Sequence, residues 1–158
     1  EYGHGISNRL TGGPGNSSCL NNDESMGEGW SDWFGLMLTM KNGDLPEDAR
    51  GIGTYATGQP TTGGGIRNYP YSRDMSVNPQ TYANLPGTGG QTHNVGEIWA
   101  TMLWDMTWFL IQEHGFDSDF YNGTGGNNIA MQLVIDGIKL QGCSPGFVDG
   151  RDAIIAAD

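Results

Sequence analysis

Two stretches near the start of the chain carry apolar side chains at helical spacing. The first, residues 1–10, ends at Gly12-Gly13-Pro14. The second, residues 23–40, has an apolar face so wide that it indicates deep burial. The apolar faces consist of Tyr2, Ile6 and Leu10 in the first helix and of Met26, Trp30, Trp33, Phe34, Met37 and Leu38 in the second.

Three more helices are predicted in the second half of the chain. One begins with Thr92 as its N-cap and stops at Gly115. Another spans residues 127–140. The last follows Ser144-Pro145, a cap followed by an N1 proline, and continues to the terminus.

Residues 43–91, which we call the insert, are rich in Gly, Pro and Thr and show little periodicity. A long irregular stretch in a compact domain is usually functional or anchored by a site. The predicted fold class is therefore mainly α, one helical unit over residues 1–158 with a long irregular Gly-rich insert. Glycine clusters at 12–15, 63–65, 87–90 and 124–126 indicate loops, and the middle two lie within the insert.

The composition narrows the list of partners. The chain has 158 residues and a formal net charge of −11, with only seven Lys and Arg. Nucleic acid and anionic membrane surfaces attract basic patches, so neither is an expected partner. The longest apolar run is interrupted by charge well before membrane-spanning length, which predicts no transmembrane helix. The strong acidity favours a secreted, extracellular protein.

Two cysteines, Cys19 and Cys143, are far apart, and neither belongs to a CxxC pair, which excludes zinc-finger and thioredoxin readings. In a secreted protein they would form one long-range disulfide, and in a cytosolic protein they would be buried thiols. The sequence leaves both alternatives open. Asn16-Ser17-Ser18 is an N-glycosylation sequon.

The first four residues match part of a metal-binding motif. Glu1-Tyr2-Gly3-His4 matches the last four positions of the HExxH zinc motif, whose first His would precede Glu1. By itself the pattern is uninformative, because Glu and His at this spacing occur on many helices. A metzincin is excluded, since that class needs Gly and His where the chain has Ser7 and Leu10.

A second motif, Met26-Gly27-Glu28-Gly29-Trp30-Ser31-Asp32, makes the first informative. Glu28 and Asp32 lie four residues apart, hence on one face of the predicted helix. Carboxylates among aromatic residues are costly unless a cation neutralises them. Residues 23–40 contain no Lys or Arg, so a salt-bridged surface turn has no visible partner. A distal Glu ligand fits the class in which two His and one Glu hold zinc and leave a fourth position for water.

The strings EYGHGISNRLTGGP and MGEGWSDWFGLML resemble the fungalysin family of metallopeptidases, which share the thermolysin-like fold. The stretches THNVGEIW and Arg151-Asp152-Ala153-Ile154 extend the resemblance over nearly the whole chain. It implies the C-terminal helical subdomain of a secreted zinc (Zn) metalloendopeptidase that hydrolyses proteins or peptides. The N-terminal lobe and the propeptide of the parent chain would be its partners.

The resemblance also implies roles for individual residues. His4 is similar to the second zinc His and Glu28 to the zinc-binding Glu. Asp32 is similar to the carboxylate that orients a zinc-bound His. Glu1 resembles the base that takes a proton from the attacking water and passes it to the leaving amine. His93 resembles the distal His that donates to the developing oxyanion.

The sequence leaves more than one role open for three side chains of the insert, Arg67, Tyr69 and Tyr71. Arg67 resembles the Arg that grips a substrate backbone carbonyl, and an ion pair with one of the many carboxylates is an equal alternative. Either tyrosine could donate to the oxyanion. His114, just before Gly115, is predicted to be a cation at a helix C-terminus without catalytic chemistry.

The pattern predicts that the parent protein is a protease and that this segment alone is inactive, because the first zinc His and the N-terminal lobe are missing from it. The alternative is a non-catalytic, metalloprotease-like binding or scaffold domain that uses its Gly-rich loops for recognition. The residue preceding Glu1 distinguishes the two. A calcium-stabilised module is disfavoured because no DxDxDG-like loop appears, but a structural calcium (Ca) ion beside the zinc stays open.

Overall fold

The computed structural model describes residues 1–87 and 91–158, and in this part of the chain the secondary structure is helical, without a named β-strand. The predicted mainly α fold with a long irregular insert is therefore confirmed. The elements are α1 (Tyr2–Leu10), α2 (Gly27–Thr39), the 3-10 helix η1 (Tyr82–Gly87), α3 (Thr92–His114), α4 (Gly126–Leu140) and α5 (Phe147–Ala157).

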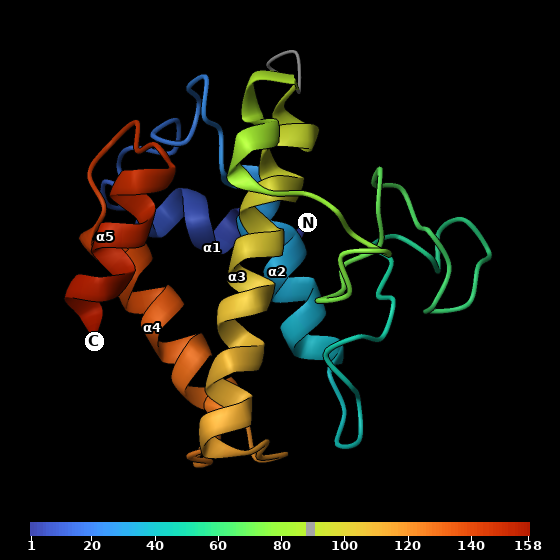
Figure 1. Cartoon of the computed structure of the whole chain (residues 1–158). Helices are drawn as coiled ribbons and strands as arrows, with labels where there is room; N and C mark the ends of the chain where they lie inside the picture. The colour runs from blue at the N-terminus through green and yellow to red at the C-terminus, as the bar shows by residue number, and fades with distance from the viewer. Residues whose placement is uncertain (88–90) are drawn as a thin grey trace.

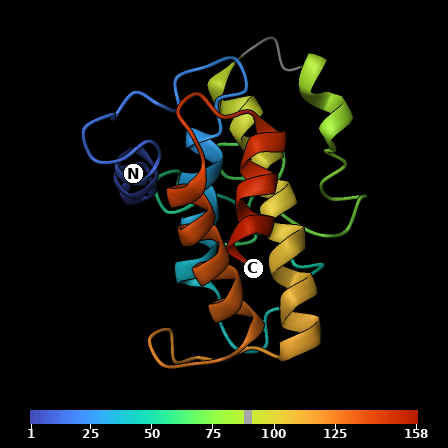
Figure 2. The same ribbon diagram turned by 90° about the vertical axis from the view of Figure 1, so that its left-hand side faces the viewer.

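The longest helix, α3, lies in the middle of the molecule (Figure 1). It packs against α2 on one side and α4 on the other, while α5 packs on α4 and α1 packs on α2. The view turned by 90° shows α4 and α5 side by side (Figure 2). Most of the insert lies beside α2, on the side away from α4 and α5 (Figure 1), while Tyr82 of η1 packs against Phe147 of α5 with ring centroids 5.9 Å apart.

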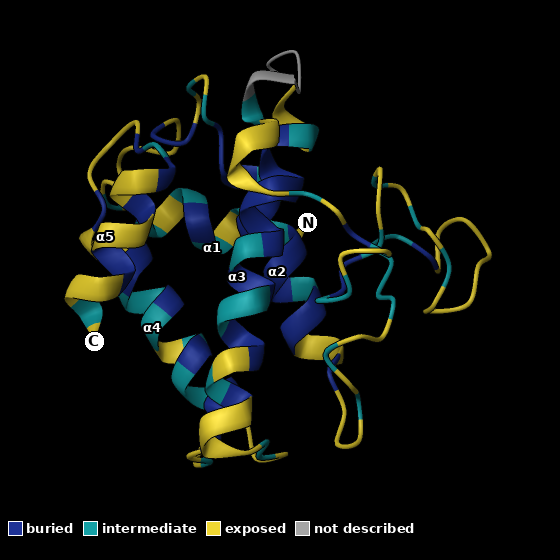
Figure 3. Cartoon of the chain, in the orientation of Figure 1, coloured by how far each residue is buried: buried dark blue, intermediate teal, exposed yellow. Residues whose placement is uncertain are grey.

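The core is dominated by tryptophans where the helices face one another. Trp30 of α2 meets the edge of Trp99 of α3 with ring centroids 5.0 Å apart, and Trp99 also packs against Phe147 of α5 at 4.9 Å. Trp33 is buried and donates through Nε1 to Thr107 Oγ1 at 2.9 Å, so its polar atom is satisfied. The outer loops of the insert are mostly exposed (Figure 3).

Helix α2 begins later than its apolar pattern predicts. It starts at Gly27 instead of residue 23 and ends at Thr39 instead of residue 40. The preceding residues are held by other contacts: Ser25 Oγ donates to the Leu20 carbonyl at 3.0 Å, and a Glu24 carboxylate oxygen accepts the Phe147 N–H at 2.8 Å. Leu38, predicted to lie on the buried face, is 64% exposed, so that assignment is wrong.

Two predicted helix caps are also wrong. Gln91 is the N-cap of α3, so Thr92 is the first helical residue. In α5 the N-cap is Gly146, whose N–H donates to Asp149 Oδ2 at 2.9 Å. Ser144 instead has φ of 59° and donates its N–H to the Cys19 carbonyl.

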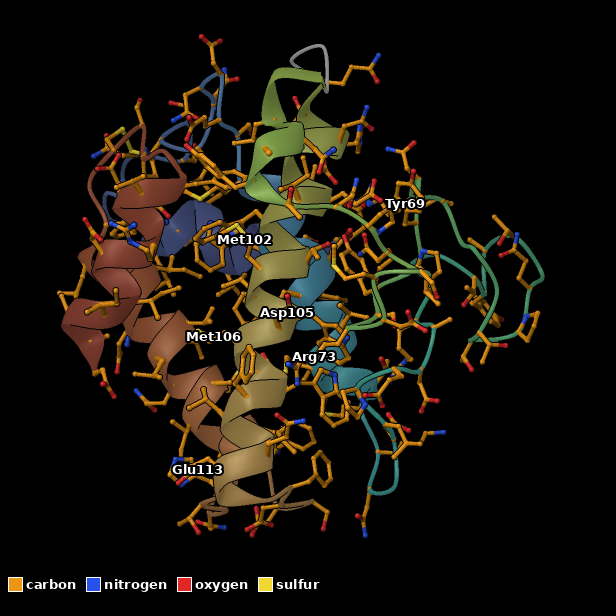
Figure 4. All side chains as sticks on the ribbon, viewed as in Figure 1. Tyr69, Arg73, Met102, Asp105, Met106 and Glu113 are labelled. Carbon is orange, nitrogen blue, oxygen red and sulfur yellow. A yellow bond between two sulfur atoms is a disulfide. The ribbon has the colours of Figure 1, made fainter. Side chains whose placement is uncertain are left out.

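The insert is fixed to the helices without forming a sheet of its own. An isolated antiparallel bridge joins Arg50 to Tyr71. Arg73 lies 3.7 Å from the Asp105 carboxylate and stacks on the Phe109 ring of α3, and Arg73 and Asp105 lie together at this junction in Figure 4. Within the glycine loop predicted at 87–90, residues 88–90 lie outside the described residues.

Cys19 and Cys143 form a disulfide, which decides between the two alternatives that the sequence leaves open. It connects the α1–α2 loop to the α4–α5 loop. Among the described helices, none combines the length and apolar character required to cross a membrane.

Candidate active site

Three predicted site residues from three helices converge. His4 of α1 and His93 of α3 each place Nε2 3.5 Å from Glu28 Oε1 of α2. His4 and Glu28 also line a cavity of about 220 Å³ together with Thr92. Two imidazoles and one carboxylate from distant parts of the sequence therefore share one small region.

Glycines allow the three helices to come this close. A Cβ added at Gly3 of α1 would lie 2.5 Å from Ser31 Cα of α2. At the crossing of α2 with α3, a Cβ at Gly96 would lie 2.6 Å from both Glu28 Cβ and Gly29 N. Because real Cβ atoms do not approach so closely, these positions require glycine, and the glycines bring His4 and His93 to Glu28.

The donor atoms of His4 and Glu28 fit one zinc ion. Zinc binds imidazole nitrogen and carboxylate oxygen at about 2.0–2.2 Å, which at a tetrahedral angle puts two donors about 3.4 Å apart. The separation of Nε2 and Oε1 is 3.5 Å. Within residues 1–87 and 91–158, no group of three or more His, Cys, Asp or Glu side chains is arranged to hold a metal. The separation of His4 and Glu28 is thus compatible with two ligands of one ion, and His93 Nε2 lies at the same distance from Glu28 Oε1.

Arg67 of the insert binds both carboxylates of α2. Its Nε donates to Asp32 Oδ2 at 2.6 Å, and its Nη2 donates to Asp32 Oδ1 at 2.8 Å and Glu28 Oε2 at 3.0 Å. Burial alone would lower the pKa of Arg67, but the hydrogen bond and charge of Asp32 raise it above its ordinary value. Glu28 and Asp32 therefore do have a basic partner, contrary to the prediction, because it comes from outside the helix.

Asp32 is almost fully buried, and both its oxygens are engaged by the insert. Besides Arg67, the Tyr71 hydroxyl donates to Oδ2 at 2.5 Å. Tyr71 is fully buried, whereas Tyr69 is 38% exposed and is the more accessible of the two tyrosines. The predicted role of Asp32 in orienting a zinc-bound His stays a prediction.

Glu97 was missed as a site residue by the sequence reasoning. It is fully buried on α3, and its oxygens accept the backbone N–H groups of Asn68 at 3.1 Å and Tyr69 at 2.8 Å. Burial raises the pKa of Glu97, while these hydrogen bonds oppose the rise. The sequence feature that could have identified Glu97 is its position as a carboxylate inside the apolar run Val95-Gly96-Glu97-Ile98-Trp99.

Glu1 is exposed at the N-cap of α1, and its backbone carbonyl accepts the His4 N–H at 3.2 Å. It also lines a second cavity, of about 370 Å³, between α2 and the insert, together with Asp32. The structure thus brings together His4, Glu28, His93, Asp32 and Arg67, with Glu1 one helical turn before His4.

Comparisons of the chain with a family model and with individual proteins agree on one family. The model of the fungalysin metallopeptidase family (M36) matches residues 1–158. The chain is 48% identical to extracellular metalloproteinase 2 of Arthroderma gypseum and 47% identical to that of Trichophyton tonsurans, each over 166 aligned residues. Each alignment covers 100% of this chain but 26% of the relative, so the chain spans about a quarter of their length. The chain belongs to the fungalysin metallopeptidase family, whose description implies a metal ion.

Proposed function

We propose that the protein containing this chain is a secreted, zinc-dependent endopeptidase in which His4 and Glu28 bind the metal. The observation that carries the proposal is the 3.5 Å separation of His4 Nε2 and Glu28 Oε1, which suits two ligands of one zinc ion. The matched relatives are named extracellular metalloproteinases. On this proposal residues 1–158 are one helical subdomain, and a third ligand and the other wall of the cleft come from outside this sequence.

The chemistry divides between the metal and the side chains of this chain. Bound zinc supplies a Lewis acid and lowers the pKa of water to about 7. The Glu1 carboxylate accepts a proton from the attacking water and returns it to the nitrogen of the leaving amine. His93 Nε2 donates a hydrogen bond to the carbonyl oxygen of the scissile bond as it becomes negative.

Arg67 can combine the two roles that the sequence keeps open. Its Nε and Nη2 are taken by Asp32 and Glu28. Its Nη1 makes no hydrogen bond within the described residues, which leaves it to donate to a backbone carbonyl of a bound peptide. The ion pair holds the guanidinium in place, and the free edge recognises the substrate.

The test is made on the full-length protein, with zinc content and peptide hydrolysis measured together. We expect His4→Ala and Glu28→Gln each to weaken zinc binding and to lower kcat/KM at least about 100-fold, because each removes a direct ligand. His114→Ala and Glu113→Gln, changes of the same kinds at exposed positions on α3, should leave both values unchanged. Full zinc content and activity in His4→Ala and Glu28→Gln would refute the proposal.

A second measurement concerns the segment alone. Residues 1–158 expressed by themselves should show no zinc-dependent hydrolysis, since two protein ligands are fewer than the three usual for catalytic zinc. Turnover by the purified segment that disappears on zinc chelation would contradict this. The same metal analysis, read for calcium, tests the structural calcium ion that the composition leaves open.

A further inference from the structure

We propose that Glu97 is a positioning residue, a buried carboxylate that fixes the insert directly after Arg67 and so holds the Arg67 guanidinium against Asp32 and Glu28. This inference rests on the proposed function, because its readout is peptide hydrolysis. Within the described residues, no hydrogen bond or ion pair joins the Glu97 side chain to the two carboxylates of α2 or to the two histidines. Its effect passes through Arg67.

The hydrogen bonds of the Glu97 carboxylate are directed at the insert. Oε1 accepts the Tyr69 N–H at 2.8 Å, and Oε2 accepts both the Asn68 N–H at 3.1 Å and the Asn68 side-chain Nδ2 at 3.0 Å. Glu97 is 0% exposed. A buried carboxylate is costly unless its oxygens are satisfied, and here all three donors come from two adjacent residues of an irregular segment.

Those two residues control where Arg67 can lie. Consecutive Cα atoms are about 3.8 Å apart, so fixing the backbone at Asn68 confines the position of Arg67. On the other side, the Ile66 N–H donates to the Ile52 carbonyl at 2.9 Å, a contact within the insert itself. Glu97 therefore provides an anchor that ties the backbone directly after Arg67 to α3.

The anchor also links Arg67 to His93. Glu97 follows His93 by four residues, one turn along α3. Asn68 Nδ2 donates in addition to Asn94 Oδ1 at 3.0 Å. The Arg67 guanidinium and the His93 imidazole are thus held at a fixed position relative to each other. A peptide that binds to both groups requires this.

The experiment compares Glu97→Gln with Glu113→Gln in the full-length protein. Glutamine keeps the size of Glu97 but replaces one acceptor oxygen by an NH₂ group that faces N–H donors. We expect Glu97→Gln to lower kcat/KM roughly 10- to 100-fold through displacement of Arg67, with zinc content retained. Glu113, exposed near the far end of the same helix (Figure 4), should tolerate the change without effect.

A double variant separates positioning from a purely structural role. If Glu97 acts through Arg67, adding Glu97→Gln to Arg67→Lys should lower kcat/KM little further than Arg67→Lys alone. Independent, multiplying effects would overturn the proposal, as would a Glu97→Gln protein as active as Glu113→Gln. Should Glu97→Gln fail to fold, Asn68→Ala, at an exposed position, removes one of the three bonds and must show the same non-additivity. A wild-type protein without zinc-dependent hydrolysis would instead refute the proposed function itself.

Discussion

Asp32 and Tyr71 form a hydrogen bond that is shut off from water. The carboxylate is 4% exposed and the tyrosine 0% exposed. Burial, helped by the nearby charge of Asp32, raises the pKa of Tyr71 well above its ordinary value of 10.0, so the phenol stays a neutral donor at physiological pH. Arg67 donates the remaining hydrogen bonds to Asp32. Arg67 and Tyr71 therefore each satisfy part of the buried charge of Asp32.

Replacing Tyr71 by Phe should therefore be costly. Because a hydrogen bond to a buried charged group is lost without compensation, we expect Tyr71→Phe to lower the free energy of unfolding by about 1.5–3 kcal/mol. Tyr69→Phe, at a partly exposed position, should change it by less than about 0.5 kcal/mol. Denaturant unfolding of both variants provides the check. Equal stabilities would show that the Asp32 carboxylate does not depend on the phenol.

At the scale of helices, the crossing of α2 with α3 determines whether the site exists. Gly29 and Gly96 face each other there, and a Cβ on Gly29 would clash with the Gly96 carbonyl oxygen. Glu28 and His93 flank this crossing, so the same close approach that packs the helices brings the two side chains together.

Gly96→Ala tests that dependence. Because the added methyl group must separate the helices, we expect a loss of about 1–3 kcal/mol in the free energy of unfolding and weaker zinc binding as Glu28 moves. Gly35→Ala on α2 is the control, since its Cβ would meet only Ile52 Cδ1, at an ordinary 3.7 Å. That variant should be neutral or up to about 1 kcal/mol more stable, because alanine favours helix. Zinc binding unaffected by Gly96→Ala would contradict this account.

Over the whole molecule, the disulfide joins two residues 124 positions apart, Cys19 and Cys143. It ties the loop after α1 to the loop before α5, near the two ends of the sequence. A crosslink that closes so long a loop restricts the unfolded chain strongly and stabilises the folded state accordingly.

Removing the disulfide should lower stability without altering the site. For the double variant Cys19→Ser/Cys143→Ser we expect a loss of about 2–5 kcal/mol, seen as a lower Tm and as insensitivity to reductant. Zinc content below that Tm should match wild type, because the site is built by α1, α2 and α3. A wild-type protein whose Tm does not change on reduction would show that the crosslink contributes nothing.

Much of the helical framework follows from local periodicity. The spacing of apolar residues predicts α1 to α5 because a helix repeats its contacts every three to four residues. Helix starts are less predictable. Before the start of α2, Glu24 bonds to Phe147, and before the start of α5, Ser144 bonds to Cys19. Both contacts join residues more than 100 positions apart, as the 123-residue separation of Glu24 and Phe147 illustrates.

The sequence alone indicated His4 and Glu28 as candidate ligands through its resemblance to the fungalysin family, and helical spacing placed Glu28 and Asp32 on one helix face. Only the tertiary structure decided that Arg67 neutralises these carboxylates, from 35 and 39 residues away. It also decided that Tyr71 is buried and that Glu97 anchors the insert. The physical reason is that the insert has no periodic pattern: its path is set by hydrogen bonds to helices that assemble only when the chain folds.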